Sequence, residues 1–337
     1  MDETRLDVIS GFLGAGKTTL INKLLREAWR GERTAVLENE FGAIGVDGDL
    51  LRGQELMVKE ITNGCICCTL KGDFVEGIED LAREYRPDRI VIEPTGIGKL
   101  GDILDACRLA AEKAPVALRS VMTVAQAPLV SAFLEVSGDF YREQIAGAPV
   151  VVLSAAQDLC AEDPPLEETL RRIRELNPGA VVFAEPWDAL DSLKLLAVAE
   201  ELTEKLVRPE AAHSNDHDPE AEHKHERRDG HSHEHDHEDH DHVLENAGFD
   251  SCSFILQETW TEEDAENLLA AMQGGDFGEI FRAKGFFPVR GRFHKLEYVY
   301  GRVSFIPADY SGEGKVVVIG RELKKAELKR AVERLRR

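Results

Sequence analysis

The sequence predicts an α/β fold in two parts: a larger domain whose mostly parallel sheet is covered by helices, followed by a smaller α/β domain. Two observations carry this prediction. Short apolar runs alternate with helix-like segments, which is the pattern of βαβ units. A histidine-rich stretch then separates these units from a second group of strand and helix signals.

Six apolar runs of strand length predict the sheet of the larger domain. In order they read LDVIS, TAVLEN, RIVIEP, SVMTVA, APVVVLS and GAVVFAEP. Their nearly continuous apolar character favours strands that are buried on both faces. The first helix should begin near Thr18 and end by Gly31, because the residues between them form an apolar stripe. The stripe consists of Leu20, Ile21, Leu24, Leu25 and Ala28. A later helix should run from about Leu166 to Leu176 and end at the NPG turn.

The distribution of histidine sets the expected domain boundaries. Ten of the eleven histidines lie between 213 and 242, among acidic residues and with almost no apolar side chain that could pack into a core. We therefore expect a first domain at 1–208, a flexible linker rich in His, Asp and Glu at 209–246, and a second domain at 247–337.

The second domain should begin with a strand in FDSCSFILQETW. Thr261 and Asp264 have the spacing of a capping box for a helix that reaches about Met272. The segments LEYVYGRVSFIPA and KVVVIG predict further strands, and the apolar residues of ELKKAELKRAVERLRR recur at helical spacing. Both element types are thus expected in the second domain.

Charge and composition exclude several classes of partner. The formal net charge of −22 over 337 residues argues against nucleic acid, because binding to phosphates needs a basic face. No apolar run approaches the roughly 20 residues of a membrane span, and the N-terminal region has no apolar segment typical of an export signal. The six cysteines lack the even spacing of a disulfide framework. We expect a cytoplasmic protein that binds neither nucleic acid nor membrane.

The segment GFLGAGKT at 11–18 matches the P-loop pattern G-x-x-x-x-G-K-[ST] directly between a predicted strand and a predicted helix. The larger domain is therefore predicted to be a P-loop NTPase domain. The alternative is an ordinary glycine-rich turn. Lys17 should neutralise the β and γ phosphates, and the Thr18 hydroxyl should bind Mg²⁺. The expected nucleotide-binding residues of this segment are Gly11, Gly14, Ala15, Gly16, Lys17, Thr18 and Thr19.

A second acidic position belongs to the same predicted site. Glu93 follows the buried run IVI at the carboxyl end of a strand, where α/β sheets bind their ligands. We expect Lys17 and Glu93 to be the catalytic residues, and Gly96 to let the backbone approach the terminal phosphate. A strand-end carboxylate without a functional role is the alternative for Glu93. Between the P-loop and this strand, a glycine-rich segment carries the acidic residues of a candidate switch. They are Glu38, Glu40, Asp47 and Asp49.

Three cysteines lie within four residues in NGCICCTL. Cys65, Cys67 and Cys68 cannot all pair with one another, and a bridge between the neighbours Cys67 and Cys68 would be strained. Clustered thiolates suit a soft or borderline ion such as Zn²⁺. Redox chemistry and buried structural cysteines remain as alternatives, since C-x-C-C is not a standard closed zinc spacing.

Taken in order, several segments resemble the CobW-type proteins of the CobW/HypB/UreG group of metal-linked GTPases. They are SGFLGAGKTTLINKLL, ENEFGAIGVD, NGCICCTL and IVIEPTGIG, followed by a histidine-rich segment and a trailing domain. The resemblance implies a P-loop GTPase followed by a CobW-like C-terminal domain. It also implies hydrolysis of GTP with Mg²⁺, coupled to delivery of Zn²⁺ (or Co²⁺) to a client metalloprotein, and a nucleotide-dependent homodimer.

The same resemblance assigns roles to single residues. Cys65, Cys67 and Cys68 match the metal motif of the group. Glu93 matches its Walker B glutamate. Glu40 and Asp47 match its acidic switch residues and are expected, like Thr18, to bind metal. We therefore hypothesise that nucleotide state alters the geometry of the segment 38–68 and with it the affinity for Zn²⁺.

The sequence departs from the group where guanine is normally recognised. The expected N-K-x-D motif is replaced by SAAQD after the run VVVL. Either Asp158 aligns with the aspartate, or Ser154 aligns with the asparagine. In both alignments an alanine replaces the lysine that packs over the base. Asp158 is our candidate for base recognition, and Gln126 stands where the preceding strand usually leads to an aspartate.

The histidine tract is the second candidate metal site. Alternation in HSHEHDH would place four imidazoles on one side of an extended chain, and imidazole binds Zn²⁺, Ni²⁺ and Co²⁺. These residues are His231, His233, His235 and His237. The alternative is a solubilising linker. His294 lies outside the tract and is expected to have a structural or surface role.

Two alternatives to a zinc-delivering GTPase remain open. The same GTPase could serve cobalt, as an accessory for cobalamin, corrinoid-protein or nitrile hydratase maturation. Alternatively, the chain could store or sense metal with a vestigial nucleotide site, an alternative that the altered SAAQD segment leaves open. Slow intrinsic hydrolysis is expected, because the sequence offers no obvious arginine finger or catalytic glutamine.

Overall fold

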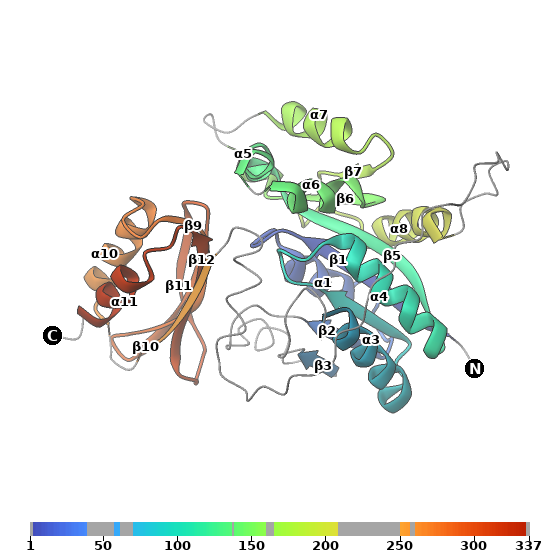
Figure 1. Cartoon of the computed structure of the whole chain (residues 1–337), viewed down its shortest axis with the longest axis horizontal. Coiled ribbons are helices and arrows are strands. Elements are labelled where there is room, and N and C mark those ends of the chain that lie inside the picture. Colours follow the sequence, from blue (N-terminus) through green and yellow to red (C-terminus); the bar gives the residue numbers. More distant parts are fainter. Residues whose placement is uncertain are drawn as a thin grey trace, which may run out of the picture.

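The computed structural model describes residues 3–38, 57–60, 70–136, 138–159, 165–207, 250–256 and 260–334. Within these ranges, a seven-stranded sheet forms the first domain and a five-stranded sheet forms the second, each covered by helices (Figure 1). The predicted α/β class is therefore confirmed. None of the described helices is long and apolar enough to cross a lipid bilayer.

The first sheet is parallel throughout and has the strand order β3-β2-β4-β1-β5-β6-β7. Its strands are β1 (Thr4–Gly11), β2 (Thr34–Glu38), β3 (Met57–Glu60), β4 (Arg89–Glu93), β5 (Val116–Gln126), β6 (Val150–Ser154) and β7 (Val181–Phe183). Each of the six predicted runs coincides with or overlaps one of these strands. Only the short edge strand β3 has no counterpart among them.

Helices cover both faces of the first sheet, as a parallel sheet requires. One face packs against α1 (Lys17–Arg26) and α8 (Ser192–Val207). The other packs against α3 (Leu70–Asp80), α4 (Leu100–Lys113), α5 (Val130–Val136), α6 (Gly138–Ala146) and α7 (Leu166–Leu176). Short helical turns occur at η1 (Leu81–Tyr85), η2 (Ala127–Leu129) and η3 (Ala156–Asp158). Along β1, Leu6 and Val8 point to the second group of helices, and Ile9 points to the first.

Helix α7 has the predicted bounds, whereas α1 is shorter than predicted. It begins at Lys17, one residue before Thr18, and ends at Arg26, so Ala28 lies beyond it. The backbone N–H of Trp29 donates to the carbonyl of Leu24 at 2.8 Å, which closes a wider turn. This turn buries the Trp29 ring in the core, and burial of a large aromatic side chain outweighs one further turn of helix.

The second sheet is antiparallel and has the order β11-β10-β9-β12-β8. Its strands are β8 (Asp250–Leu256), β9 (Glu279–Val289), β10 (Arg292–Val299), β11 (Arg302–Ala308) and β12 (Gly314–Arg321). Helices α10 (Glu262–Gln273) and α11 (Lys325–Arg334) lie on the side of this sheet that faces away from the first domain (Figure 1). The capping box of Thr261 and Asp264 is present at the start of α10. The long strand β9, at the centre of this sheet, was not predicted.

The other face of the second sheet packs against the first domain. Phe281 of β9 and Val317 and Ile319 of β12 belong to the same buried cluster as the residues beneath the first sheet. The segment 39–56, the segment 61–69 and the predicted linker at 209–246 lie outside the described residues. The contact between the two domains is made by described elements of both, and it lies next to the loop that follows β1.

Candidate functional site

The loop between β1 and α1 has the backbone geometry of a phosphate-binding loop. Gly14 and Gly16 have φ angles of 72° and 101°, which glycine adopts without strain. Gly16 is the N-cap of α1 and provides no side-chain cap, so the first N–H groups of the helix face the opening of the loop. Helix N-termini of this kind bind anions.

Two loops meet closely at this site. An added Cβ on Gly96, which follows β4, would lie 2.5 Å from the backbone nitrogen of Leu13. Only glycine allows the β4 loop to approach the P-loop backbone at this distance. The close approach at Gly96 is thus toward the protein's own P-loop, and its expected role at the terminal phosphate stays a prediction.

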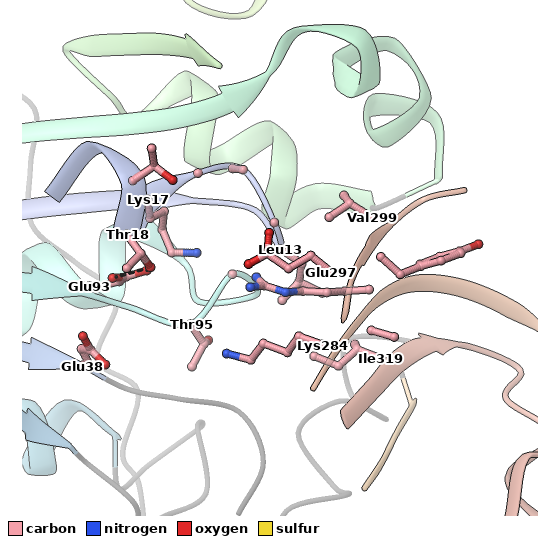
Figure 2. A pocket seen from close by; sticks show the side chains of 18 of the residues that line it. Leu13, Lys17, Thr18, Glu38, Glu93, Thr95, Lys284, Glu297, Val299 and Ile319 are labelled. Atoms are coloured by element: carbon pink, nitrogen blue, oxygen red, sulfur yellow. Dashed lines mark hydrogen bonds between the residues drawn. The ribbon is translucent and has the colours of Figure 1, made fainter. Parts of the chain in front are cut away.

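The Thr18 hydroxyl of α1 lies against Glu93 at the carboxyl end of β4, and Glu38 lies at the carboxyl end of the adjacent strand β2 (Figure 2). The Thr18 hydroxyl donates to Glu93 at 2.9 Å from Oε1 and 3.2 Å from Oε2. Glu38 ends β2 and is the register partner of Glu93 in β4, so both side chains leave the sheet on the same side. Both are buried. Oxygen donors from hydroxyl and carboxylate groups are the ligands that Mg²⁺ prefers, so this set fits the ion.

Lys17 lies over the P-loop. Its ammonium donates to the carbonyl of Gly11 at 3.1 Å and to the carbonyl of Phe12 at 3.5 Å. Ser154, at the end of β6, donates through its hydroxyl to the carbonyl of Ala15 at 2.6 Å. These bonds hold the loop against the Lys17 side chain and against the end of β6. The contact from Ser154 was not anticipated from the sequence, where this residue was considered only as a candidate for base recognition.

A cavity of about 410 Å³ opens in front of the P-loop. This volume falls within the usual range of small-molecule sites. The first domain contributes residues 13–19 of the loop and helix, Glu38, Glu93 and the segment 94–96. The second domain contributes residues of β9, β10 and β12, among them Arg282, Lys284, Glu297, Val299 and Ile319 (Figure 2). The sequence did not indicate that the second domain lines this cavity.

The second domain rests directly on the P-loop. A Cβ added to Gly14 would lie 2.4 Å from Cγ2 of Val299, the last residue of β10. Beside this contact, five aromatic rings from both domains form a continuous cluster. Phe12 lies 4.7 Å from Phe133 between ring centroids, and Phe133 lies 5.5 Å from Tyr300. Tyr141 and Phe281 complete it, at 5.5 and 6.4 Å from Phe133.

The aromatic cluster carries no charge. Burial raises the pKa of both phenols, Tyr141 and Tyr300, so they remain neutral at physiological pH. Through this cluster, Phe12 of the P-loop is linked to the second domain by apolar contacts alone.

The region expected to recognise the base adopts an unusual backbone. Ala155 has a φ of 54°, and residues 156–158 form the short helix η3, which ends at Asp158. On the same side of the P-loop, an added Cβ on Gly16 would lie 3.3 Å from Cζ2 of Trp187. Trp187 is a further residue beside the P-loop that the sequence did not indicate, since it belongs to no recognised pattern.

The other predicted metal ligands lie outside the described residues. These are Glu40, Asp47, Cys65, Cys67, Cys68, His231, His233, His235 and His237. Among the residues that the structure describes, no group of three or more His, Cys, Asp and Glu could hold a metal ion. His294 stacks on Phe305 in the second sheet, with 5.1 Å between ring centroids, which fits the structural role expected for it.

Comparison with known families identifies the family to which the chain belongs. Residues 6–184, more than half of it, match the family described as "CobW/HypB/UreG, nucleotide-binding domain". The chain belongs to the CobW/HypB/UreG family. Residues 249–336 match the "Cobalamin synthesis protein cobW C-terminal domain". The cavity thus lies between the nucleotide-binding domain of the family and the cobW C-terminal domain.

Several curated members of the CobW/HypB/UreG family are similar to this chain. A protein of Escherichia coli K12 named "Zinc chaperone YeiR" is 36% identical over 216 residues, covering 64% of both chains. "Zinc chaperone CobW" of a Sinorhizobium species is 35% identical over 208 residues, covering 60% of this chain and 56% of its own. "Zinc-regulated GTPase metalloprotein activator 1" of Schizosaccharomyces pombe is 32% identical over 204 residues, covering 57% and 48%. The matches span about half to two thirds of these relatives.

Proposed function

We propose that this protein is a Mg²⁺-dependent GTPase that couples the binding and hydrolysis of GTP to delivery of a zinc ion to a client metalloprotein. The observation that carries the proposal is the pairing of Thr18 with Glu93 at 2.9 Å inside a cavity formed by a P-loop. The family supports nucleotide binding. The names of the relatives, zinc chaperones and a zinc-regulated GTPase, support zinc as the metal and guanine as the base of the nucleotide.

Different residues of the chain would bind the phosphates and the Mg²⁺ ion of the nucleotide. The N–H groups of residues 14–19 would bind the α and β phosphates, and the Lys17 ammonium would leave the carbonyls of Gly11 and Phe12 to bind the β and γ oxygens. Thr18 and Glu93 would hold Mg²⁺, which would neutralise charge on the phosphate oxygens. Glu38 adds a second buried carboxylate at the same edge of the sheet.

We further propose that Cys65, Cys67 and Cys68 carry the zinc ion, with Glu40 and Asp47 in the switch between them and the P-loop. β2 ends at Glu38 beside Glu93, so the segment of the sequence that carries these residues follows directly on a residue that lines the nucleotide cavity. A change of nucleotide at this edge would therefore act directly on the first residue of that segment. In this scheme the histidine tract, with His231, His233, His235 and His237, serves as a flexible reservoir.

Zinc titration tests the proposal. Purified protein competes with a chromophoric chelator for Zn²⁺ without nucleotide, with GDP and with a non-hydrolysable GTP analogue. We expect one tight site whose affinity differs between GDP and the analogue, and which disappears in the triple variant Cys65→Ala/Cys67→Ala/Cys68→Ala. Cys252→Ala, a substitution of a half-buried cysteine in the second sheet, is the matched control and should leave this site unchanged.

A metal store is the second candidate function, because alanine occupies both positions where the guanine motif would have its lysine. Tight zinc binding that survives in the triple variant and is the same in all nucleotide states would favour it. GTP turnover that increases with zinc would count against it. Replacing Zn²⁺ by Co²⁺ in the same titration separates a zinc carrier from a cobalt accessory.

The remaining parts of the proposal concern organisation. The first domain would act as the GTPase at 1–208, residues 209–246 would act as a flexible linker, and 247–337 would act as the C-terminal domain, in the cytoplasm. Contact with the client, and dimerisation in the triphosphate state, are parts of the proposed cycle. Sedimentation with GDP and with the GTP analogue tests dimerisation.

A further inference from the structure

We propose that Lys284, in the second domain, binds the terminal phosphate of the nucleotide, and so makes the contact between the two domains depend on nucleotide state. The inference deepens the proposed function and rests on it. It concerns a residue that lies more than 260 positions after the P-loop and belongs to no recognised motif.

Lys284 is a buried lysine in the centre of a sheet. Its side chain is only 8% exposed, although lysine is among the residue types least often buried. It lies in the long central strand β9, with Glu297 of β10 and Val317 of β12 as its register partners. Because Val317 packs into the core of the first domain, this face of the sheet is the one directed at the P-loop.

The side chain points into the cavity. Figure 2 shows Lys284 extending from the second sheet toward Thr95 in the loop after β4. Both residues line the cavity together with the P-loop. The pairing of Thr18 with Glu93 marks the edge at which β and γ phosphates are expected. Thr95 follows Glu93 by two residues, so an ammonium directed there lies on the γ side of the site.

Charge in the cavity agrees with this assignment. Of the cationic residues that the second domain contributes, Lys295 pairs with Glu297, which also lines the cavity. Arg282 lies on β9 two residues before Lys284 and is half-buried. The cavity also contains the carboxylates Glu38 and Glu93, which suit a cation beside the phosphates. A buried ammonium that lines the same cavity is well suited to an anion with several negative charges.

The consequence is a difference between two nucleotide states. A triphosphate would offer Lys284 a phosphate that a diphosphate lacks, so the second domain would gain a contact with the first only before hydrolysis. Differential contacts of this kind are what allow a ligand to shift a conformational equilibrium. Val299, the last residue of β10, meets the P-loop, and Tyr300, in the turn after β10, belongs to the aromatic cluster. Both would therefore sense the shift.

The experiment compares nucleotide affinities of full-length variants. Fluorescent GDP and a fluorescent non-hydrolysable GTP analogue are titrated with Mg²⁺ into wild type, Lys284→Met and Lys315→Met. Methionine keeps an unbranched apolar stem without charge. Lys315 is the matched control, because it lies on the same face, in β12, but is directed at Tyr310, 5.9 Å from its ring centroid.

We expect Lys284→Met to weaken binding of the analogue by roughly 10- to 100-fold, the range for a lost hydrogen bond to a charged group. GDP affinity should be unchanged, which also shows that the variant is folded. Lys284→Arg should retain part of the preference, and Lys315→Met should behave as wild type. Unchanged binding of the analogue, or an equal loss for both nucleotides, would overturn the inference while leaving the proposed function intact. Failure of wild type to bind either nucleotide would refute the proposed function and the inference with it.

A measurement on wild type keeps the inference testable if Lys284→Met does not fold. Hydrogen exchange of the strand β9 should be slower with the GTP analogue than with GDP, because the terminal phosphate would hold Lys284. Equal exchange of β9 in both states would overturn the inference.

Discussion

Replacement of Phe133 by alanine should destabilise both domains. The Phe133 ring is 2% exposed and contacts Phe12 beside the P-loop, Tyr141, and Phe281 and Tyr300 in the second domain. It is the only described residue whose ring contacts all four of the others in the cluster. A cavity at this position would therefore weaken both the packing under the P-loop and the contact between the two domains.

The magnitude follows from the buried area. An aromatic side chain buries at least about 150 Å², and at about 25 cal/mol per Å² its removal from water contributes about 4 kcal/mol. Measured Phe→Ala substitutions in cores cost about 3–5 kcal/mol. We expect Phe133→Ala to lower the free energy of unfolding by about 3–5 kcal/mol, whereas Phe133→Leu should cost less than about 1.5 kcal/mol because it keeps most of the volume.

Urea titration provides the assay. Tryptophan fluorescence reports on both domains, because Trp29 lies in the first and Trp260 in the second, and circular dichroism gives an independent transition. Leu193→Ala is the control, since Leu193 is 67% exposed and its loss should change stability by less than about 0.5 kcal/mol. A cost below about 1 kcal/mol for Phe133→Ala, or a loss confined to one domain, would refute the reasoning.

Three further substitutions or modifications have defined outcomes. Gly14→Ala should weaken GTP binding by at least about tenfold, because its methyl group meets Val299 and its φ of 72° is strained; Val299→Ala should restore only part of the affinity, as measured by nucleotide titration. Burial raises the pKa of the Cys107 thiol to about 12, so at pH 8 iodoacetamide should leave Cys107 unmodified in the folded protein and alkylate it after denaturation, as peptide mass spectrometry would show. Thr261→Ala removes the side chain that accepts from the N–H of Asp264 and should cost about 1 kcal/mol in thermal or urea unfolding.

The sequence predicts the first domain well because its strands are long apolar runs. Burial on both faces makes β1, β4 and β6 visible without alternation. The capping box of α10 is equally local, so Thr261 and Asp264 are sufficient to locate it. β9 escaped prediction for a different reason. It mixes glycine, proline and charged residues with apolar ones, and its pairing with β10 and β12 is visible only in three dimensions.

Prediction of the site was limited by distance along the chain. The P-loop and Glu93 follow from local patterns, and the structure brings Thr18 and Glu93 into contact. Lys284 and Val299 enter the same cavity from the second domain, and no periodicity relates residues separated by hundreds of positions. Trp187 was missed in the same way, because a single aromatic residue after a short strand carries no motif.

The contact of Val299 with Gly14 has a consequence for synthesis of the protein. The ribosome makes Gly14 near the start of the chain, but its partner follows only about 285 residues later. At translation rates of about 5–20 residues per second, this gap lasts roughly 15–60 s. In the later part of that interval, after Phe133 but before Phe281 and Tyr300 have been made, the nascent first domain would expose Phe133 and the surface around the P-loop. An unfinished chain would thus offer an apolar surface to chaperones before it could bind nucleotide in its final form.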